Sequence, residues 1–323
     1  MEKDLIKVNN LSIKFNTKLG YVSAVDDISF NIKEKEIFAL VGESGSGKST
    51  TAYALMNLIN ARNSIKKGEI LFKGKDILKL NEREMTKIRG KEIAMIFQNP
   101  LDSLNPIYTA GSQVYEAIAL DKVEKREAWN RVINIFKEVR LSDPEQRIKS
   151  YPHELSGGMR QRVMIGMMLS RRPELLIADE PTTALDVTIQ SQILDIIKEL
   201  KSKFNTSVLV ITHDFGIVAE IADRVGVMYA GKILEIGDVY QIFENPLHPY
   251  TQLLMKSLPR ITKKEGRLQT IEGSVPNLTD DIKGCRFNNR CPYSLDACKG
   301  EDSEMLEIEK GHYVACHLVV KEK

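Results

Sequence analysis

One short stretch limits what this chain can fold into: the residues from Gly42 to Ser49, GESGSGKS. They match the pattern G-x-x-x-x-G-K-[ST] at every constrained position. An apolar run, Ile37 to Val41, precedes the stretch, and a segment with helical periodicity begins near Lys48. Strand, glycine-rich loop and helix in this order begin a parallel α/β core. A flexible linker would not need a Lys-Ser pair between two apolar elements, so we predict a phosphate-binding loop.

The residue types of this loop suit a nucleotide phosphate. Glycines let successive backbone N–H groups turn towards phosphate oxygens, and the following helix N-terminus adds the positive end of its dipole. We expect Lys48 to reach the β and γ phosphates and the Ser49 hydroxyl to ligate Mg2+. The candidate nucleotide-binding residues of the loop are Gly42, Ser44, Gly45, Ser46, Gly47, Lys48, Ser49 and Thr50.

A second apolar run, Leu175 to Ala178, ends in two carboxylates, Asp179 and Glu180. Downstream of a phosphate loop, a carboxylate at a strand end is expected beside the magnesium ion, so Asp179 is a candidate Mg2+ ligand. Glu180 is the candidate general base that polarises the attacking water. Taken alone, the same pattern also describes a strand that simply meets solvent.

The remaining pattern predicts an α/β domain with an insertion. Residues Ile6 to Ile32 alternate apolar and polar side chains, which predicts short antiparallel strands. From about Gln113 to Ile148 the chain is helical in pattern and heavily charged, and we interpret it as a helical insertion. A solvated surface helix is an equally good interpretation of its composition. The α/β alternation then resumes with a helix from about Gly157, a helix over Ile189 to Leu200 and a strand over Ser207 to Ile211.

Charge and hydropathy argue against nucleic-acid binding and against a membrane span in this chain. The 323 residues include 46 Lys and Arg against 44 Asp and Glu, a formal net charge of +2, so no strong basic field is present to hold nucleic acid. The opening MEKDLIKVNN lacks the apolar core of a secretory signal, and no run of about 18 apolar residues occurs. Any role at a membrane is therefore expected to come through docking.

Between the phosphate loop and the Asp179-Glu180 pair, the chain reads LSGGMRQR from Leu155 to Arg162. This stretch resembles the signature motif of the ATP-binding-cassette family. Ser156 and the amides of Gly157 and Gly158 stand at a predicted helix N-terminus, a second anion-binding element in the same chain. In isolation, a capped helix with a Gly-Gly turn and no ligand would explain these residues equally well.

Other positions match motifs of the same family, and the resemblance implies their roles. Gln98, in IFQNP, matches the Q-loop, which contacts magnesium and water and faces the transporter. Ala184 to Asp186 matches the D-loop, and His213, in ITHD, matches the switch histidine that contacts the γ phosphate. Phe15 is the expected counterpart of the aromatic residue that stacks on adenine, with Tyr21 as the substitute. Alone, each would be read as an ordinary loop polar or core aromatic residue.

This resemblance covers roughly residues 6 to 240 and implies a P-loop ATPase fold with an antiparallel β subdomain. In the family, the signature of one cassette closes over the ATP held by another. This chain has one phosphate loop and one signature motif, so it contains half of each of two composite sites. We therefore expect a second ATPase subunit that binds ATP and Mg2+ together with this one.

A change of composition at Asn245 to Pro249 introduces a tail with its own Gly and Pro turns. The tail contains all the cysteines of the chain, Cys285, Cys291, Cys298 and Cys316. Four thiolates could hold a [4Fe-4S] cluster or a tetrahedral Zn2+, and their spacing, wider than C-x-x-C pairs, favours the cluster. Four unligated buried cysteines are the remaining alternative.

The stretches NPLHPYTQLL, IEGSVPNL and GCRFNNRCPY are similar to the C-terminal region of the ATPases of oligopeptide, dipeptide and nickel importers. This second resemblance implies an iron-sulfur cluster at the four cysteines and a peripheral subunit on the cytoplasmic side of the cell membrane. It also implies a paralogous chain as the second ATPase subunit, two membrane-embedded permease subunits and, indirectly, an extracellular substrate-binding protein. A second copy of this chain as that ATPase subunit stays open.

We predict a nucleotide-binding domain over residues 1–240, with a helical subdomain over about 100–172, and a small C-terminal domain over 241–323. Peptide uptake driven by ATP is the expected function. Import of nickel or another small solute, a cassette severed from an exporter, and a soluble cassette ATPase of translation or DNA repair remain open.

Overall fold

The computed structural model describes residues 3–18, 20–98, 104–183, 185–257, 271–279 and 282–320. The chain forms two compact units. The helical unit comprises Met1–Leu5, Ile32–Ile37 and Lys79–Ile211. The phosphate-loop unit comprises Ile6–Asn31, Phe38–Leu78 and Thr212–Lys323.

The helical unit is built on three parallel strands. β6 (Ile93–Ile96) pairs with β7 (Leu175–Asp179), which pairs in turn with β8 (Ser207–Thr212). Every residue of these strands is buried. Strands covered on both faces are continuous apolar runs, which explains why the sequence located β7 and β8 to within a residue.

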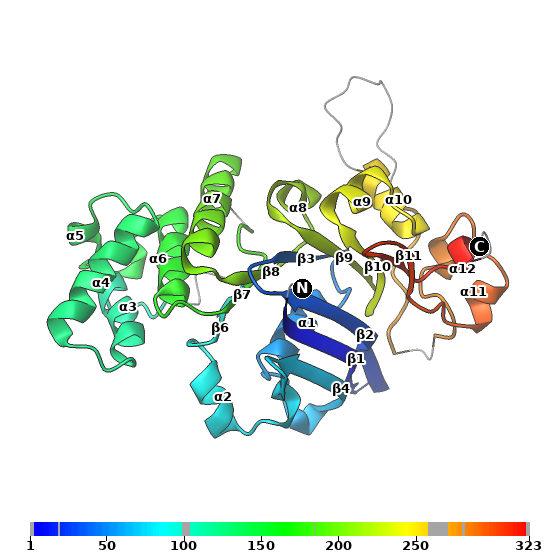
Figure 1. Cartoon of the computed structure of the whole chain (residues 1–323), viewed down its shortest axis with the longest axis horizontal. Coiled ribbons are helices and arrows are strands. Elements are labelled where there is room, and N and C mark those ends of the chain that lie inside the picture. The colour runs from blue at the N-terminus through cyan, green and yellow to red at the C-terminus, as the bar shows by residue number, and fades with distance from the viewer. Residues whose placement is uncertain are drawn as a thin grey trace, which may run out of the picture. The chain divides into compact units, whose positions relative to one another are not determined.

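Helices α3, α4 and α6 pack against one another, and Figure 1 shows them gathered together in green. The helix α4 buries Ala128, Val132 and Phe136, which lie four residues apart and therefore on one face. A purely solvated surface helix would bury no such face, so the predicted helical insertion is confirmed. The helices of this unit are α2 (Glu82–Ile88), α3 (Ala110–Ala119), α4 (Lys125–Glu138), α5 (Pro144–Arg147), α6 (Gly157–Leu169) and α7 (Val187–Phe204).

The phosphate-loop unit contains a mixed sheet. β3 (Ile37–Val41) pairs in parallel with β9 (Arg224–Tyr229), and β10 (Lys232–Asp238) runs antiparallel to β9. The C-terminal tail extends this sheet, because β12 (His312–Val314) pairs with β10, and β11 (Leu306–Glu309) pairs with β12. The predicted domain boundary near residue 240 stays a prediction.

A second sheet of this unit has the order β2, β1, β4, β5, formed by β2 (Gly20–Lys33), β1 (Asp4–Thr17), β4 (Ser64–Phe72) and β5 (Lys75–Asp76). The prediction of short strands is wrong, because β1 and β2 each have 14 residues. Asn10 and Asp27 adopt positive φ angles of 49° and 51°, and the Asn10 amide donates to Asp27 Oδ1 at 3.0 Å. These irregularities bend the strands without ending them.

The helices of the phosphate-loop unit are α1 (Lys48–Leu55), α8 (Phe215–Ile221), α9 (Val239–Glu244), α10 (Pro249–Ser257), α11 (Ala297–Gly300) and α12 (His317–Val320). Short 3-10 turns occur at Ala61–Asn63, Ile77–Lys79, Pro152–Glu154 and Asn288–Arg290.

Three aromatic rings join the tail to the mixed sheet. Tyr229, Tyr250 and Phe287 are fully buried, and their ring centroids lie 4.7 to 5.2 Å apart. They come from β9, α10 and the cysteine-bearing segment, so one hydrophobic cluster ties these elements together.

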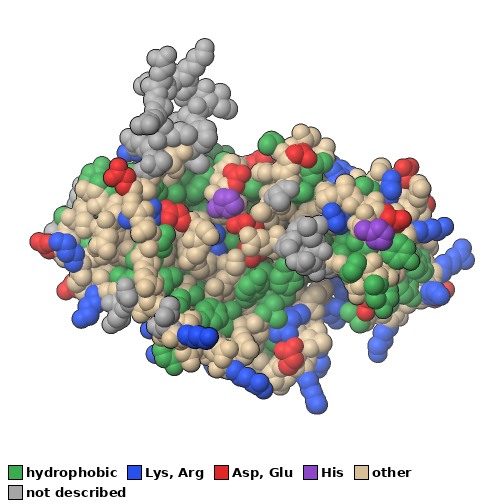
Figure 2. Space-filling view, turned by 180° about the vertical axis from the view of Figure 1, so that it is seen from behind, with side chains coloured by type: hydrophobic (Ala, Val, Ile, Leu, Met, Phe, Trp, Pro, Cys, Tyr) green, Lys and Arg blue, Asp and Glu red, His purple; other side chains and the backbone are tan. Residues whose placement is uncertain are grey.

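Both signs of charge are present on the exterior. Figure 2 shows Lys and Arg side chains together with Asp and Glu side chains on one face. In the part of the chain that the structure describes, none of the helices combines the length and the apolar character needed to span a bilayer.

Candidate nucleotide site

The phosphate loop, Gly42 to Ser49, is shaped by close backbone contacts. Gly42 and Gly47 have φ angles of 150° and 102°, a region that side chains rarely adopt. A Cβ atom on Gly42 would lie 1.9 Å from the carbonyl oxygen of Met228, and one on Gly47 would lie 2.4 Å from that of Ala24. Glycine is therefore the only residue that fits at these two positions.

The side chain of Lys48 lies inside the loop. Its ammonium donates to the carbonyl oxygens of Gly42 at 2.7 Å and Glu43 at 2.8 Å, and to Ser46 Oγ at 3.2 Å. The loop is closed further by the Gly231 N–H, which donates to the Ser46 carbonyl at 2.8 Å. The loop is thus a preformed turn with its cation held at the centre. Ser44 and Gly45 form its exposed tip, and Ser49 and Thr50 follow in the first turn of α1.

In the helical unit, the end of β7 presents a carboxylate with fixed orientation. Asp179 is fully buried, and Glu180 follows it with a φ angle of 46°, an uncommon conformation for a residue with a side chain. Glu180 Oε2 accepts a hydrogen bond from Gln98 Nε2 at 2.9 Å and another from Thr183 Oγ1 at 2.8 Å. The structure therefore brings Gln98 and Glu180 together, as an active-site pair would require.

Thr183 is a candidate site residue that sequence reasoning missed. It lies three residues after Glu180, and its hydroxyl donates to the same carboxylate oxygen as Gln98. The only sequence signal for this role is a hydroxyl residue shortly after the Asp-Glu pair. That signal alone does not show that the turn brings the hydroxyl back to Glu180.

The signature turn, Ser156 to Gly158, begins α6. Ser156 caps the helix, because its Oγ accepts the Met159 N–H at 3.3 Å. A Cβ atom on Gly158 would lie 2.8 Å from a methyl group of Ile189, whereas one on Gly157 would lie 3.9 Å from Leu185. The turn therefore packs against the start of α7 and leaves Ser156 exposed.

The predicted D-loop lies beside this turn in the same unit. Asp186 caps α7 by accepting the Ile189 N–H at 2.9 Å, and its side chain is exposed. Gln161 of α6 is buried and donates to the Pro181 carbonyl at 2.5 Å, which fixes α6 against the segment that follows Glu180. Ala184, also predicted here, lies outside the described residues.

The other predicted residues belong to the phosphate-loop unit. His213 follows β8 and is exposed, just before Asp214, which caps α8. Phe15 is half-buried in β1 opposite Ser64 of β4, whereas Tyr21 of β2 is 51% exposed. Phe15 is therefore the less exposed of the two candidate rings, and its role as the adenine platform stays a prediction.

The chain thus has a phosphate loop, carboxylates at the end of β7 and a glycine-rich turn before α6. Known proteins share these features. The model of the ABC transporter family matches residues 25–183, and that of the oligopeptide/dipeptide transporter C-terminal region matches residues 234–298. The chain belongs to the ABC transporter family.

Two relatives cover nearly the whole of this ABC protein. It is 48% identical over 320 residues to the oligopeptide transport ATP-binding protein AppD of Bacillus subtilis, spanning 98% of each chain. It is 45% identical to the dipeptide transport ATP-binding protein DppD of Escherichia coli, spanning 97% of this chain and 96% of DppD. Among solved structures, the dimeric post-hydrolysis ATP-binding cassette MJ0796 with ADP and Pi matches at 27% identity and a TM-score of 0.65. That match covers 72% of this chain and 98% of MJ0796. As an ABC ATPase, the chain hydrolyses ATP.

The four cysteines of the ABC protein line one small cavity, although the C-terminal model matches only the first three. The Cys285 N–H donates to the Cys298 carbonyl at 2.9 Å, and Cys298 and Cys316 are buried. Burial raises the pKa of Cys285 to about 11 and also raises the pKa values of Cys291 and Cys316. Within the described residues, no three His, Cys, Asp or Glu side chains are grouped so as to hold a single metal ion.

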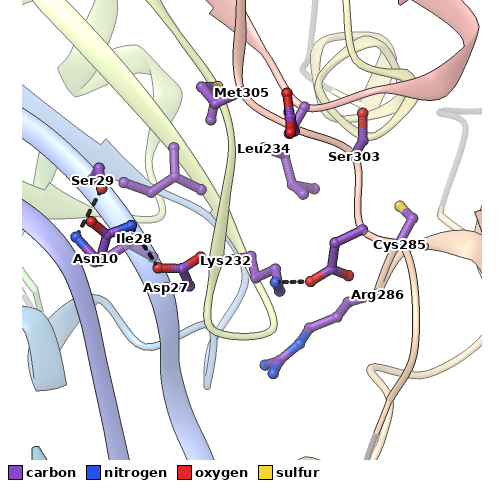
Figure 3. A pocket seen from close by; sticks show the side chains of 14 residues that line it. Asn10, Asp27, Ile28, Ser29, Lys232, Leu234, Cys285, Arg286, Ser303 and Met305 are labelled. Atoms are coloured by element: carbon purple, nitrogen blue, oxygen red, sulfur yellow. Dashed lines mark hydrogen bonds and ion pairs between the residues drawn. The ribbon is translucent and has the colours of Figure 1, made fainter. Parts of the chain in front are cut away.

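A larger cavity of about 310 Å³ lies elsewhere in the phosphate-loop unit (Figure 3). Among its charged side chains, Lys232 forms ion pairs with Asp302, at 2.5 Å, and with Asp26, at 3.3 Å. Among its described lining residues, none is a predicted nucleotide ligand. Cys285 and Ser303, labelled in Figure 3, also line the cysteine cavity, so the two cavities adjoin.

Proposed function

We propose that this chain is the ATP-hydrolysing subunit of an importer for di- and oligopeptides. The observation that carries the proposal is full-length similarity to AppD and DppD, together with the match of residues 234–298 to the C-terminal region of such transporters. Cassettes of soluble or exporting proteins would not be expected to share that C-terminal region. Nickel or another small solute is the alternative cargo, since the cargo is chosen by the permease and the binding protein.

The proposed roles of the nucleotide-site residues are those that the family resemblance implies. Lys48 and the loop amides bind the phosphates, His213 contacts the γ phosphate and Phe15 supports the adenine. Ser49, Asp179 and Gln98 are the proposed ligands of the Mg2+ ion. The bound Mg2+ neutralises charge that develops on the phosphoryl oxygens.

Glu180 is proposed to take the proton of the attacking water as the bond to the γ phosphorus forms and the bond to ADP breaks. Two neutral donors, Gln98 and Thr183, hold Glu180 Oε2 and so orient the carboxylate. The products are ADP and inorganic phosphate.

The signature turn is proposed to complete the site of a neighbouring ATPase subunit, a paralogous chain. The exposed Ser156 and the first amides of α6 form an anion site that faces away from its own helix. Closure around two nucleotides would provide the movement that two membrane-embedded permease subunits use, with the chain bound peripherally at the cytoplasmic side. An extracellular binding protein would deliver the peptide.

The test is to extract the chain gently from membranes, identify the co-purified subunits by mass spectrometry and reconstitute them in vesicles. We expect ATP hydrolysis to rise when a peptide-loaded binding protein is added. Stimulation by nickel, with none by peptides, would contradict the peptide assignment.

We also propose that the cysteines hold a [4Fe-4S] cluster, with Zn2+ as the alternative. All four thiols line one cavity, which is the donor set of such a cluster. A brown protein that bleaches with reductant is expected, and a colourless protein with stoichiometric zinc would contradict the cluster.

A further inference from the structure

One residue of the phosphate loop is held from outside the loop at both its backbone and its side chain. The Glu43 N–H donates to Tyr250 Oη at 3.1 Å, and Glu43 Oε2 accepts from Arg290 Nη1 at 2.9 Å. Its carbonyl oxygen also accepts from Lys48 at 2.8 Å. Glu43 is an unconstrained position of the loop pattern, so nothing in the motif itself calls for these contacts.

Arg290 is fixed by several partners besides Glu43. Its Nε donates to the Glu272 carbonyl at 3.0 Å, and its Nη2 donates to the Ile271 carbonyl at 3.2 Å. Its Nη1 also contacts Tyr229 Oη at 3.2 Å, and only 7% of its side chain is exposed. The planar guanidinium is therefore held in one orientation by acceptors on its three nitrogens.

This arginine belongs to the cysteine-bearing segment. It ends the 3-10 turn that starts at Asn288, and Cys291 follows it directly. The turn is anchored by Phe287, whose ring packs against Tyr229 and Tyr250 in the buried cluster. The same tyrosines contact Arg290 and Glu43, so the tail reaches the phosphate loop through a rigid set of side chains.

We propose that Arg290 is a positioning residue for nucleotide binding, which keeps the Glu43 carboxylate neutralised and turned away from the phosphates. The inference rests on the proposed role of the loop in binding ATP. A carboxylate inside a phosphate-binding loop opposes the anion, and the Glu43 side chain, 27% exposed, is shielded only in part by water once Arg290 is lost. Through Arg290, the affinity of the loop for nucleotide depends on the folded state of the cysteine-bearing segment.

The test compares Mg-ATP dissociation constants of the full chain in four variants, measured by calorimetry. Arg290→Met is expected to weaken binding roughly tenfold, because the Glu43 carboxylate then opposes the phosphates without a compensating cation. The double variant Glu43→Gln with Arg290→Met is expected to return within about threefold of wild type, because it also removes the uncompensated charge. Arg290→Lys keeps the charge, so its dissociation constant is expected to lie between those of Arg290→Met and the double variant. Lys299→Met, an exposed cation of the same segment, is the matched control.

Kinetics separate positioning from a general loss of structure. The loss in Arg290→Met should fall on KM rather than kcat, because Arg290 touches none of the residues proposed for the chemical step. Unchanged affinity in Arg290→Met would overturn the proposal, as would equal weakening in the single and double variants, which would indicate a structural role. If Arg290→Met does not fold, a Glu43→Gln affinity below wild type would overturn it as well. A wild-type chain that binds no Mg-ATP at all would instead refute the proposed function.

Discussion

The phosphate loop and the signature turn are both glycine-rich and both precede a helix, yet their glycines serve different physical needs. In the phosphate loop, Gly42 and Gly47 have positive φ angles, and neighbouring carbonyl oxygens stand where a side chain would begin. In the signature turn, Gly157 and Gly158 open α6, outside the positive-φ region. A Cβ on Gly157 would meet its nearest neighbour only at 3.9 Å.

The comparison shows that one element is complete within its own chain and the other is open. The phosphate loop encloses Lys48, which is 6% exposed, and its carbonyl and hydroxyl groups already bind the ammonium. The signature turn leaves Ser156 exposed at the helix start, with its N–H groups directed outward. The phosphate loop is thus closed by contacts of its own unit, whereas the signature turn is exposed.

Alanine substitutions at the two kinds of glycine give the largest expected contrast. Gly42→Ala places a Cβ against the Met228 carbonyl and should cost about 3 kcal/mol or more, with loss of nucleotide binding. Gly157→Ala fits an ordinary helical position and should change the free energy of unfolding by less than about 1 kcal/mol. Thermal unfolding and Mg-ATP titration of both variants would measure this, and equal effects would remove the distinction.

Acidification should lower the free energy of unfolding of the phosphate-loop unit. Burial lowers the pKa of His248 to about 4, from its ordinary 6.5, and a nearby carboxylate, Glu235, offsets this only in part. Its Nδ1 accepts the N–H of Tyr250, the residue that also holds Glu43. Between pH 6.5 and 4 the unfolded chain binds a proton at this site that the folded chain does not, so stability falls as the pH falls.

The loss expected from His248 is about 2 kcal/mol between pH 7 and pH 5. Urea unfolding at the two pH values measures it, and His248→Gln, which does not titrate, is the control. If the two proteins lose the same stability on acidification, His248 is not the cause.

The smallest effects are expected from the caps beside the signature turn. Ser156 accepts its helix N–H at 3.3 Å, whereas Asp186 accepts its own at 2.9 Å. Replacement by alanine should cost about 0.5 kcal/mol at Ser156 and about 1 kcal/mol at Asp186. Urea unfolding of the helical unit in the full chain provides the measurement. A larger loss of stability at Ser156 would mean that the turn is built for the fold and not for a ligand.

Short sequence patterns predicted the buried strands and the phosphate loop, because each of these features is formed by residues that are neighbours along the chain. The buried strands β7 and β8 are apolar runs, and the phosphate loop is determined by glycine and lysine spacing. The length of β1 and β2 was missed, because irregularities at Asn10 and Asp27 interrupt the alternation without interrupting the strands.

Long-range partners were not predictable from the sequence. Gln98 and Glu180 are 82 residues apart, and Glu43 and Arg290 are 247 apart, with no spacing rule that links either pair. Family resemblance named Gln98 but gave no indication of Arg290. Only the folded chain shows that the cysteine-bearing segment contacts the phosphate loop.

The most direct test of whether the exposed signature turn binds a neighbouring subunit's nucleotide is a measurement of molecular mass in solution. The Glu180→Gln variant, which should bind ATP but hydrolyse it about 10² to 10⁴ times more slowly, is studied by light scattering with its co-purified ATPase partner. The account predicts one ATPase pair that forms with Mg-ATP and separates when the nucleotide is removed. Saturation with Mg-ATP without pairing would contradict the account.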